Sequence, residues 1–199
     1  MPEGGNVRWG WHRLGDRWAG RLVADADIVP GELVLDIGAG DGAITAPLVA
    51  TGARVVAVEM HPRRLAVLRQ RFADAPVSVV RADAADLRLP RRPFRVVACP
   101  PYAITSALLR RLLAPGSNMA AADLILQHAA ARRWADGDAP GAGRWRHDFT
   151  ATLGPRVPRA AFTPRPPVDT TTLVLRRVPF GGSRGRPGRR HGGQSTERR

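Results

Sequence analysis

The chain has 199 residues, of which 31 are basic and 17 acidic, so its formal net charge is +14. Its 44% hydrophobic and 24% charged residues are typical of one globular domain of ordinary size and exclude disorder throughout. A single cysteine excludes a disulfide framework, and no apolar run reaches the ~20 residues that span a bilayer. The acidic N-terminus does not resemble a signal sequence. We therefore expect a cytoplasmic monomer with no membrane partner.

Apolar segments of two kinds alternate along the chain. Short apolar runs predict buried strands at residues 33–37, 54–59, 77–80, 94–98, 124–127 and 170–175. Apolar residues at helical spacing predict helices at residues 14–26, 43–50, 62–72, 104–112 and 129–134, and a loop rich in Gly, Pro and Asp follows at residues 136–143. This alternation predicts an α/β protein with a doubly wound, mostly parallel sheet.

The last twenty residues, 180–199, differ in composition from the rest. They contain six glycines, six arginines and one glutamate, so their net charge is 6 − 1 = +5, and we expect a disordered tail after a folded domain at residues 1–179. Every basic residue of the chain is an arginine. A GC-rich genome explains the absence of lysine but not the excess of positive charge, which favours a polyanionic partner such as nucleic acid. The tail is either a phosphate-binding segment or a dispensable end.

A glycine-rich loop follows the first predicted strand, with the sequence Asp36-Ile-Gly-Ala-Gly-Asp-Gly42. Glycines let a backbone turn tightly and approach a ligand closely. The pattern Gly38-x-Gly40-x-x-Ala43 also fits the dinucleotide-binding fingerprint. On its own the loop is weak evidence, because a strand and a helix can be joined by such a turn without any ligand.

An acidic residue follows each of the first three predicted strands: Asp36, Glu59 and Asp83. Parallel strands bring such residues to one end of the sheet, and Glu59 stands 19 residues after Gly40, where an acid can bind ribose hydroxyls. Three carboxylates favour a ligand with a sugar and an amine, such as S-adenosylmethionine, over a pyrophosphate. Two alternatives stay open: Glu59 as a surface carboxylate, and either Asp83 or Asp86 as the cap of the next turn.

The fourth predicted strand ends in Cys99-Pro-Pro-Tyr102. Two prolines make a stiff turn, and a carbonyl in it can accept a hydrogen bond from a planar amino group. Tyr102 can stack on the base that carries this amine. We therefore interpret Cys99, Pro100 and Tyr102 as catalytic residues, against the alternative of a stiffened strand exit with Tyr102 packed in the core.

Together these motifs resemble the ribosomal RNA adenine-N6 dimethyltransferases, and most closely the macrolide-resistance (Erm-type) methylases of actinobacteria. The resemblance continues through residues 124–127, 157–158, 162–164, 166 and 168–169, and covers roughly residues 9 to 178. It implies a seven-stranded Rossmann-like methyltransferase domain at residues 1–179 that takes S-adenosylmethionine as cofactor. The cofactor-binding residues that it implies are Asp36, Gly38, Gly40, Glu59, Asp83 and Cys99.

Three features depart from the family pattern. The family usually has asparagine where Cys99 stands, and a thiol is a weaker hydrogen-bond acceptor than an amide, which leaves the carbonyl of Pro100 to hold the amine. Trp11-His12-Arg13 replaces the family's Gln-x-Phe element, so Trp9, Trp11 or His12 is expected to help close the cofactor site, unless the tryptophans only anchor the first helix. The family's helical C-terminal domain is expected to be absent, with the Arg/Gly tail in its place.

The resemblance implies transfer of one methyl group to N6 of an adenine in 23S ribosomal RNA, with resistance to macrolides, lincosamides and type B streptogramins as the outcome. The base has to flip out of its stack to react. The five histidines show no metal-ligand spacing, so no metal is expected. The alternatives are a DNA or protein N-methyltransferase, and a non-catalytic RNA-binding or ribosome-assembly factor with a decayed site.

Overall fold

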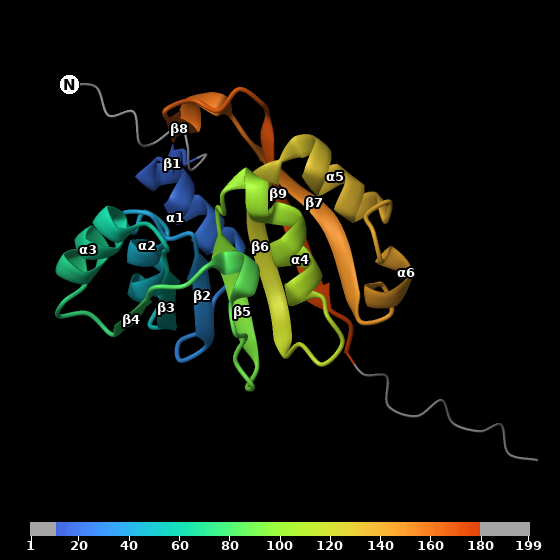
Figure 1. Ribbon diagram of the computed structural model, residues 1–199, viewed down its shortest axis with the longest axis horizontal. Coiled ribbons are helices and arrows are strands. Elements are labelled where there is room, and N and C mark those ends of the chain that lie inside the picture. Colours follow the sequence, from blue (N-terminus) through green and yellow to red (C-terminus); the bar gives the residue numbers. More distant parts are fainter. Residues whose placement is uncertain (1–10, 180–199) are drawn as a thin grey trace, which may run out of the picture.

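The computed structural model describes residues 11–179; Trp9 and the expected tail at 180–199 lie outside them. A seven-stranded sheet of order β4-β3-β2-β5-β6-β9-β7 forms its centre (Figure 1). Its strands are β2 (Leu33–Ile37), β3 (Arg54–Val58), β4 (Val77–Val80), β5 (Phe94–Ala98), β6 (Met119–Gln127), β7 (Phe149–Val157) and β9 (Thr170–Arg177). Strands β2 to β6 pair in parallel, and β9 runs antiparallel between β6 and β7. The prediction of a doubly wound, mostly parallel seven-stranded sheet is confirmed.

Helices cover both faces of this sheet. They are α1 (Asp16–Asp25), α2 (Thr45–Ala50), α3 (Pro62–Arg71), α4 (Thr105–Leu112), α5 (His128–Asp136) and α6 (Ala142–Trp145). The central strand β2 is therefore buried along its whole length. Its alternate side chains serve two cores, since Leu35 packs in the cluster of α4 and α5 and Val34 in the cluster of α1 and α2. None of the helices at residues 11–179 is long and apolar enough to span a membrane.

A second, two-stranded sheet joins the N-terminal segment to a loop far along the chain. Strand β1 (Arg13–Leu14) pairs antiparallel with β8 (Phe162–Thr163), as Figure 1 shows near the grey N-terminal trace. Leu14 was expected in the first helix, and that expectation is wrong. The amide of Gly15 donates to the carbonyl of Ala161 at 2.8 Å, so the backbone stays extended until α1 begins at Asp16.

Strand β7 is absent from the sequence prediction. Its Gly154-Pro155 pair is typical of a turn, and an interior strand would not accept a proline that lacks an N–H. β7 tolerates it because it is the outermost strand and its register shifts between Leu153 and Arg156. The loop expected at residues 136–143 also ends earlier than predicted, because α6 begins at Ala142.

The order of the strands reverses direction at one point of the sheet, beside β2. From β2 the chain proceeds outward through β3 and β4, and it then returns to the other side of β2 with β5 and β6. The carboxyl ends of β2 and β5 therefore form the switch point at which open α/β sheets bind ligands. Both the glycine loop and the Cys99–Tyr102 turn begin there.

Candidate active site

The glycine loop and the proline turn touch each other at the switch point. Gly38 and Gly40 have φ values of +78° and +62°, which favour glycine. A Cβ atom on Gly38 would lie 3.0 Å from Cδ of Pro101, and one on Gly40 would lie 2.8 Å from Nε1 of Trp11. Both positions thus need glycine for conformation and for space, and the two motifs predicted from separate strands share one place.

Asp36 is a buried carboxyl group with one free oxygen. Its Oδ2 accepts a 2.6 Å hydrogen bond from Oγ1 of Thr45, whereas Oδ1 is buried and has no hydrogen-bond partner among the described residues. Burial raises the pKa of Asp36 to about 7, and the nearby charge of Glu59 adds to this effect. A buried oxygen without a donor is unusual, and a cationic ligand group would satisfy it.

Glu59 holds the glycine loop to the start of α3. Its Oε2 accepts from the amide of Gly40 at 2.9 Å, and its Oε1 accepts from the amide of His61 at 2.7 Å. Nε of Arg64 lies 3.6 Å from Oε2, and the Arg64 guanidinium lies 4.9 Å from the centre of the Trp11 ring. A carboxylate has about four acceptor positions, so Glu59 can still accept from two hydroxyl groups.

The third acid, Asp83, lies at the surface and caps a short turn. Its Oδ1 accepts from the amide of Ala85 at 2.8 Å, which answers the choice that the sequence left open, because Asp86 instead pairs with Arg111 at 3.4 Å. Met60, which directly follows Glu59 and is 36% exposed, is a further candidate that the motifs did not predict. The signal that could have found it is a large apolar side chain directly after an acid that ends a strand. The side chain of Met60 offers an apolar surface to a planar ring of a ligand.

Cys99 and Tyr102 are both half-buried in the turn after β5. Burial, with a smaller effect from the charge of Asp36, raises the pKa of the Cys99 thiol to about 12, so the thiol stays protonated and is a poor nucleophile. The hydroxyl of Tyr102 is buried and has no partner in the described part of the chain, and burial raises its pKa. The ring of Tyr102 stacks against His12, with 5.7 Å between ring centres.

Residues 11–13 cover the glycine loop. Nε of Arg13 lies 2.5 Å from Oδ2 of Asp41, a contact that raises the pKa of Arg13, and its Nη2 lies 2.7 Å from Asp16. Nδ1 of His12 lies 2.8 Å from the carbonyl of Pro164. The hollow that remains beside Asp36 and Cys99 holds about 20 Å³, which is room for about one water molecule.

The donor set at this end of the sheet fits S-adenosylmethionine. The free oxygen of Asp36 suits an ammonium group, Glu59 suits a pair of ribose hydroxyls, and Gly40 lets a ligand approach the backbone. The volume does not fit while Trp11 lies on the loop, so this segment has to move before such a ligand enters. Within residues 11–179, no group of three His, Cys, Asp or Glu side chains could hold a metal ion.

The strand order, the glycine loop after the central strand and the proline turn after its neighbour define a methyltransferase of the Rossmann-like class. More particularly, the family model "Ribosomal RNA adenine dimethylase" matches residues 17–180. The chain belongs to this family of S-adenosylmethionine-dependent methyltransferases, as the motifs of the sequence predicted.

Relatives with known names fall in the same family. The chain is 40% identical over 148 residues to an rRNA adenine N-6-methyltransferase of Corynebacterium diphtheriae, and 37% identical over 177 residues to the mycinamicin-resistance protein MyrB of Micromonospora griseorubida. These matches cover 73% and 87% of the chain, which spans only 58% and 56% of the two relatives. The structure of the 23S rRNA methyltransferase ErmE superimposes with a TM-score of 0.72 at 31% identity, over 82% of this chain and 68% of that one.

Proposed function

We propose that the protein transfers a methyl group from S-adenosylmethionine to N6 of an adenine in 23S ribosomal RNA. The observation that carries this proposal is the contact between the glycine loop and the Cys99–Tyr102 turn, which sets a cofactor site beside a base site. The names of the relatives, which include a 23S rRNA methyltransferase and a mycinamicin-resistance protein, support the substrate. Methylation removes a hydrogen-bond donor from the base, so we expect resistance to macrolides, lincosamides and type B streptogramins.

In this proposal the methyltransferase domain is residues 1–179, it acts as a monomer, and it holds the cofactor at the carboxyl ends of the first strands. The cofactor supplies a methyl group on a sulfonium, which leaves as a neutral thioether. Asp36 holds the ammonium of the methionine part, while Glu59 holds the ribose hydroxyls. Asp83 lies near the adenine ring, Gly38 and Gly40 give backbone access, and Cys99 lines the wall next to the target.

Tyr102 and Pro100 hold the target base. Tyr102 stacks on the flipped adenine, and the carbonyl of Pro100 accepts a hydrogen bond from its amine. That bond orients the nitrogen lone pair toward the methyl group, so the chain contributes mainly by positioning. No strong general base is needed, because the amine proton becomes acidic once its nitrogen is alkylated and can pass to water. The protonated thiol of Cys99 is not suited to take it.

The cover over the site has to open for both ligands. For a base to lie between the rings of His12 and Tyr102, the two ring centres would have to be about 7 Å apart, which is two contact distances of ~3.5 Å. The two ring centres are 5.7 Å apart. His12 therefore occupies the stacking position of the base and leaves it when the base arrives. Trp11 moves with it and frees Gly40 for the cofactor.

The test is to incubate the protein with labelled S-adenosylmethionine and protein-free 23S RNA, and to identify the modified nucleoside by mass. Label on one adenine as N6-methyladenosine is the expected result. RNA binding without label would favour the non-catalytic RNA-binding factor, and label on DNA or protein instead would favour the other methyltransferases. Expression in a sensitive host should raise the inhibitory concentration of macrolides.

Cys99→Asn is the sharpest variant for the departure from the family pattern. An amide carbonyl is a better acceptor than a thiol, so the variant should transfer methyl faster or add a second one. A fall in both would show that the surroundings of Cys99 are adapted to the thiol. The midpoint of urea unfolding, compared with that of the unaltered protein, controls for damage to the fold.

A further inference from the structure

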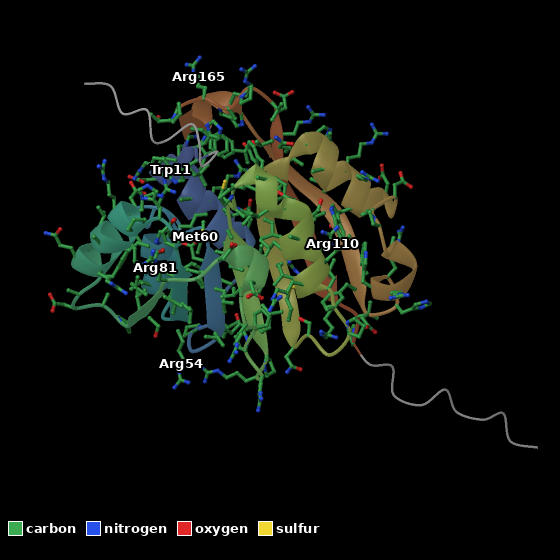
Figure 2. All side chains as sticks on the ribbon, viewed as in Figure 1. Trp11, Arg54, Met60, Arg81, Arg110 and Arg165 are labelled. Atoms are coloured by element: carbon green, nitrogen blue, oxygen red, sulfur yellow. The ribbon has the colours of Figure 1, made fainter. Side chains whose placement is uncertain are left out.

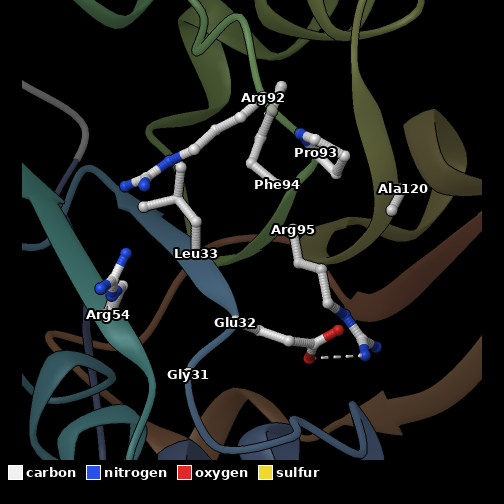
Figure 3. A pocket seen from close by; sticks show the side chains of 9 residues that line it. All are labelled: Gly31, Glu32, Leu33, Arg54, Arg92, Pro93, Phe94, Arg95 and Ala120. Carbon is white, nitrogen blue, oxygen red and sulfur yellow. Dashed lines mark hydrogen bonds and ion pairs between the residues drawn. The ribbon is translucent and has the colours of Figure 1, made fainter.

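The amino end of the sheet, opposite the glycine loop, carries a hollow lined with arginines. It has a volume of about 260 Å³ and lies where β2, β3 and β5 begin. Figure 3 shows that Arg95 turns toward Glu32, while Arg54 and Arg92 extend on the other side of Leu33. Figure 2 places Arg54 at the opposite end of the molecule from Trp11. Nothing in the proposed methyl transfer uses this end of the sheet.

The arginines of this hollow fall into two groups. Arg95 is committed to the protein: it pairs with Glu32 at 3.2 Å and donates to the carbonyls of Ala26 and Asp27. Arg54 and Arg92 are exposed, and neither guanidinium has a hydrogen bond or an ion pair within the described part of the chain. The positive charge of Arg95 stabilises the partial negative charge on the carbonyls at the end of α1, whereas Arg54 and Arg92 have no such role.

Two other hollows lie along the same end of the sheet as this one. A hollow of about 500 Å³ shares Glu32 and Arg95 with it, and one of about 380 Å³ includes Arg91. The charged side chains that line the three are six arginines and two acids. Arg95, Arg111 and Arg176 are in ion pairs, whereas Arg54, Arg91 and Arg92 have none within the described part of the chain. β9 also ends here, and residues 180–199, with six more arginines, follow it in the chain.

We infer that this arginine surface, centred on Arg54 and Arg92, is a second RNA-binding site that holds the phosphate backbone of the ribosomal RNA away from the methylated base. The inference rests on the proposed RNA substrate. Guanidinium groups without protein partners bind phosphodiesters and release counterions. The aromatic side chain in the hollow, Phe94, is only 2% exposed and cannot stack on a base, so the site recognises backbone and not sequence.

The test compares Arg54→Ala/Arg92→Ala with Arg69→Ala/Arg144→Ala. The control pair removes the same charge from α3 and α6, where both side chains are exposed and have no partner among the described residues. Affinity for protein-free 23S RNA is measured across a salt series. Each lost phosphate contact should reduce the slope of log K against log salt by about 0.7–0.9, so the first pair should lose about 1.5 in slope and roughly tenfold in affinity at low salt.

Two results would overturn the inference. Equal losses in both pairs would mean that only net charge matters. Unchanged RNA affinity, with inorganic phosphate binding lost in Arg54→Ala/Arg92→Ala, would mean that the hollow takes a small phosphate compound. Failure of the proposed function is separate: it would show as absent methyl transfer and absent cofactor binding in the unaltered protein, whatever the salt dependence.

Discussion

The two ends of the central sheet differ in charge and in access. At the carboxyl end, the charged side chains beside the glycine loop are one arginine and two aspartates, a net charge of 1 − 2 = −1, and a covering segment leaves about 20 Å³. At the amino end, three open hollows are lined by six arginines, of which Arg54, Arg91 and Arg92 have no ion pair among the described residues. A small cationic cofactor binds more tightly in an enclosed site, because its attraction to desolvated carboxylates is stronger there than in water. An RNA backbone instead needs an open surface of exposed arginines. One basic protein can thus keep an acidic pocket, because the carboxylates and the unpaired arginines lie at opposite ends of the sheet.

Removing the acid that shapes the closed end should have the largest effect. In Glu59→Ala the amide of Gly40 in the glycine loop loses its acceptor. In the proposed function the cofactor also loses the acceptor of its ribose hydroxyls. Hydrogen bonds to charged groups contribute about 1.5–3 kcal/mol each, so two of them predict a loss of at least ~100-fold in S-adenosylmethionine affinity by calorimetry. Glu32→Ala, which removes an acid from the amino end, should leave that affinity unchanged; equal effects would break the distinction between the two ends.

Tyr102→Ala should come next. Stacking of a base on an aromatic ring contributes about 1–3 kcal/mol, so methyl transfer to RNA should fall by ~10–100-fold while cofactor affinity stays the same. Tyr102→Phe keeps the ring and removes a hydroxyl that has no partner in the described residues, so it should retain activity. Equal losses in the two variants would contradict the stacking role.

The pKa of Asp36 predicts a pH dependence of cofactor binding at the closed end. An ammonium ligand requires the ionised carboxyl, and with a pKa of about 7 its ionised fraction falls roughly tenfold from pH 8 to pH 6. The α-amino group of the ligand, with a pKa of about 7.7–8.0, gains its proton over the same interval, so cofactor affinity should fall by a smaller factor of roughly four. Asp36→Asn should bind more weakly and should not show this fall. A slope that persists in the variant would assign the titration to another group.

The same pKa affects the stability of the protein without ligand. The pKa of Asp36 is about 7 in the folded state and near 3.8 in the unfolded chain, so the folded state binds the proton more tightly. Protonation of Asp36 therefore stabilises the fold, and this stabilisation is complete below about pH 4 and lost by pH 7. Urea unfolding of the protein and of Asp36→Asn at pH 5 and pH 8 measures it. The difference in unfolding free energy between the two pH values should be smaller in the variant.

His12→Ala should have the smallest effect, and in the opposite direction. An aromatic pair contributes about 0.5–1.5 kcal/mol, so releasing Tyr102 from His12 should raise kcat/KM for a short RNA by ~2–10-fold. His147→Ala, an exposed histidine in the turn before β7, is the control and should change nothing. A decrease in His12→Ala would show that His12 helps to hold the base.

Much of the fold could be predicted because apolar runs in a doubly wound sheet are buried on both faces. Strands β2, β4 and β5 match the predicted ranges, and α3 begins at the predicted Pro62. Strand β7 could not be predicted, since an outermost strand accepts a Gly-Pro pair that has no place elsewhere in a sheet. Leu14 was misassigned because its spacing fits a helix, and only a bond to distant Ala161 keeps it extended.

The candidate site also has features that could be predicted from the sequence and features that could not. The residues at strand ends, such as Asp36 and Glu59, could be predicted from spacing because parallel strands end together. The pairing of Arg13 with Asp41 and the place of Arg64 between Trp11 and Glu59 depend on contacts across the fold, for which spacing contains no signal. The roles given to the site residues stay predictions, which the variants above test. The 1–179 domain boundary also stays a prediction.

The pairing of β1 with β8 has a consequence for the order in which the protein is built. During synthesis the segment with Trp11, His12 and Arg13 leaves the ribosome well before Thr163, the partner of Arg13, which is added 163 − 13 = 150 residues later. Chains fold from the N-terminus as they emerge, so the glycine loop and the strand next to it can assemble while this ladder is still impossible. The cover over the site is therefore among the last parts of the nascent chain to fall into place.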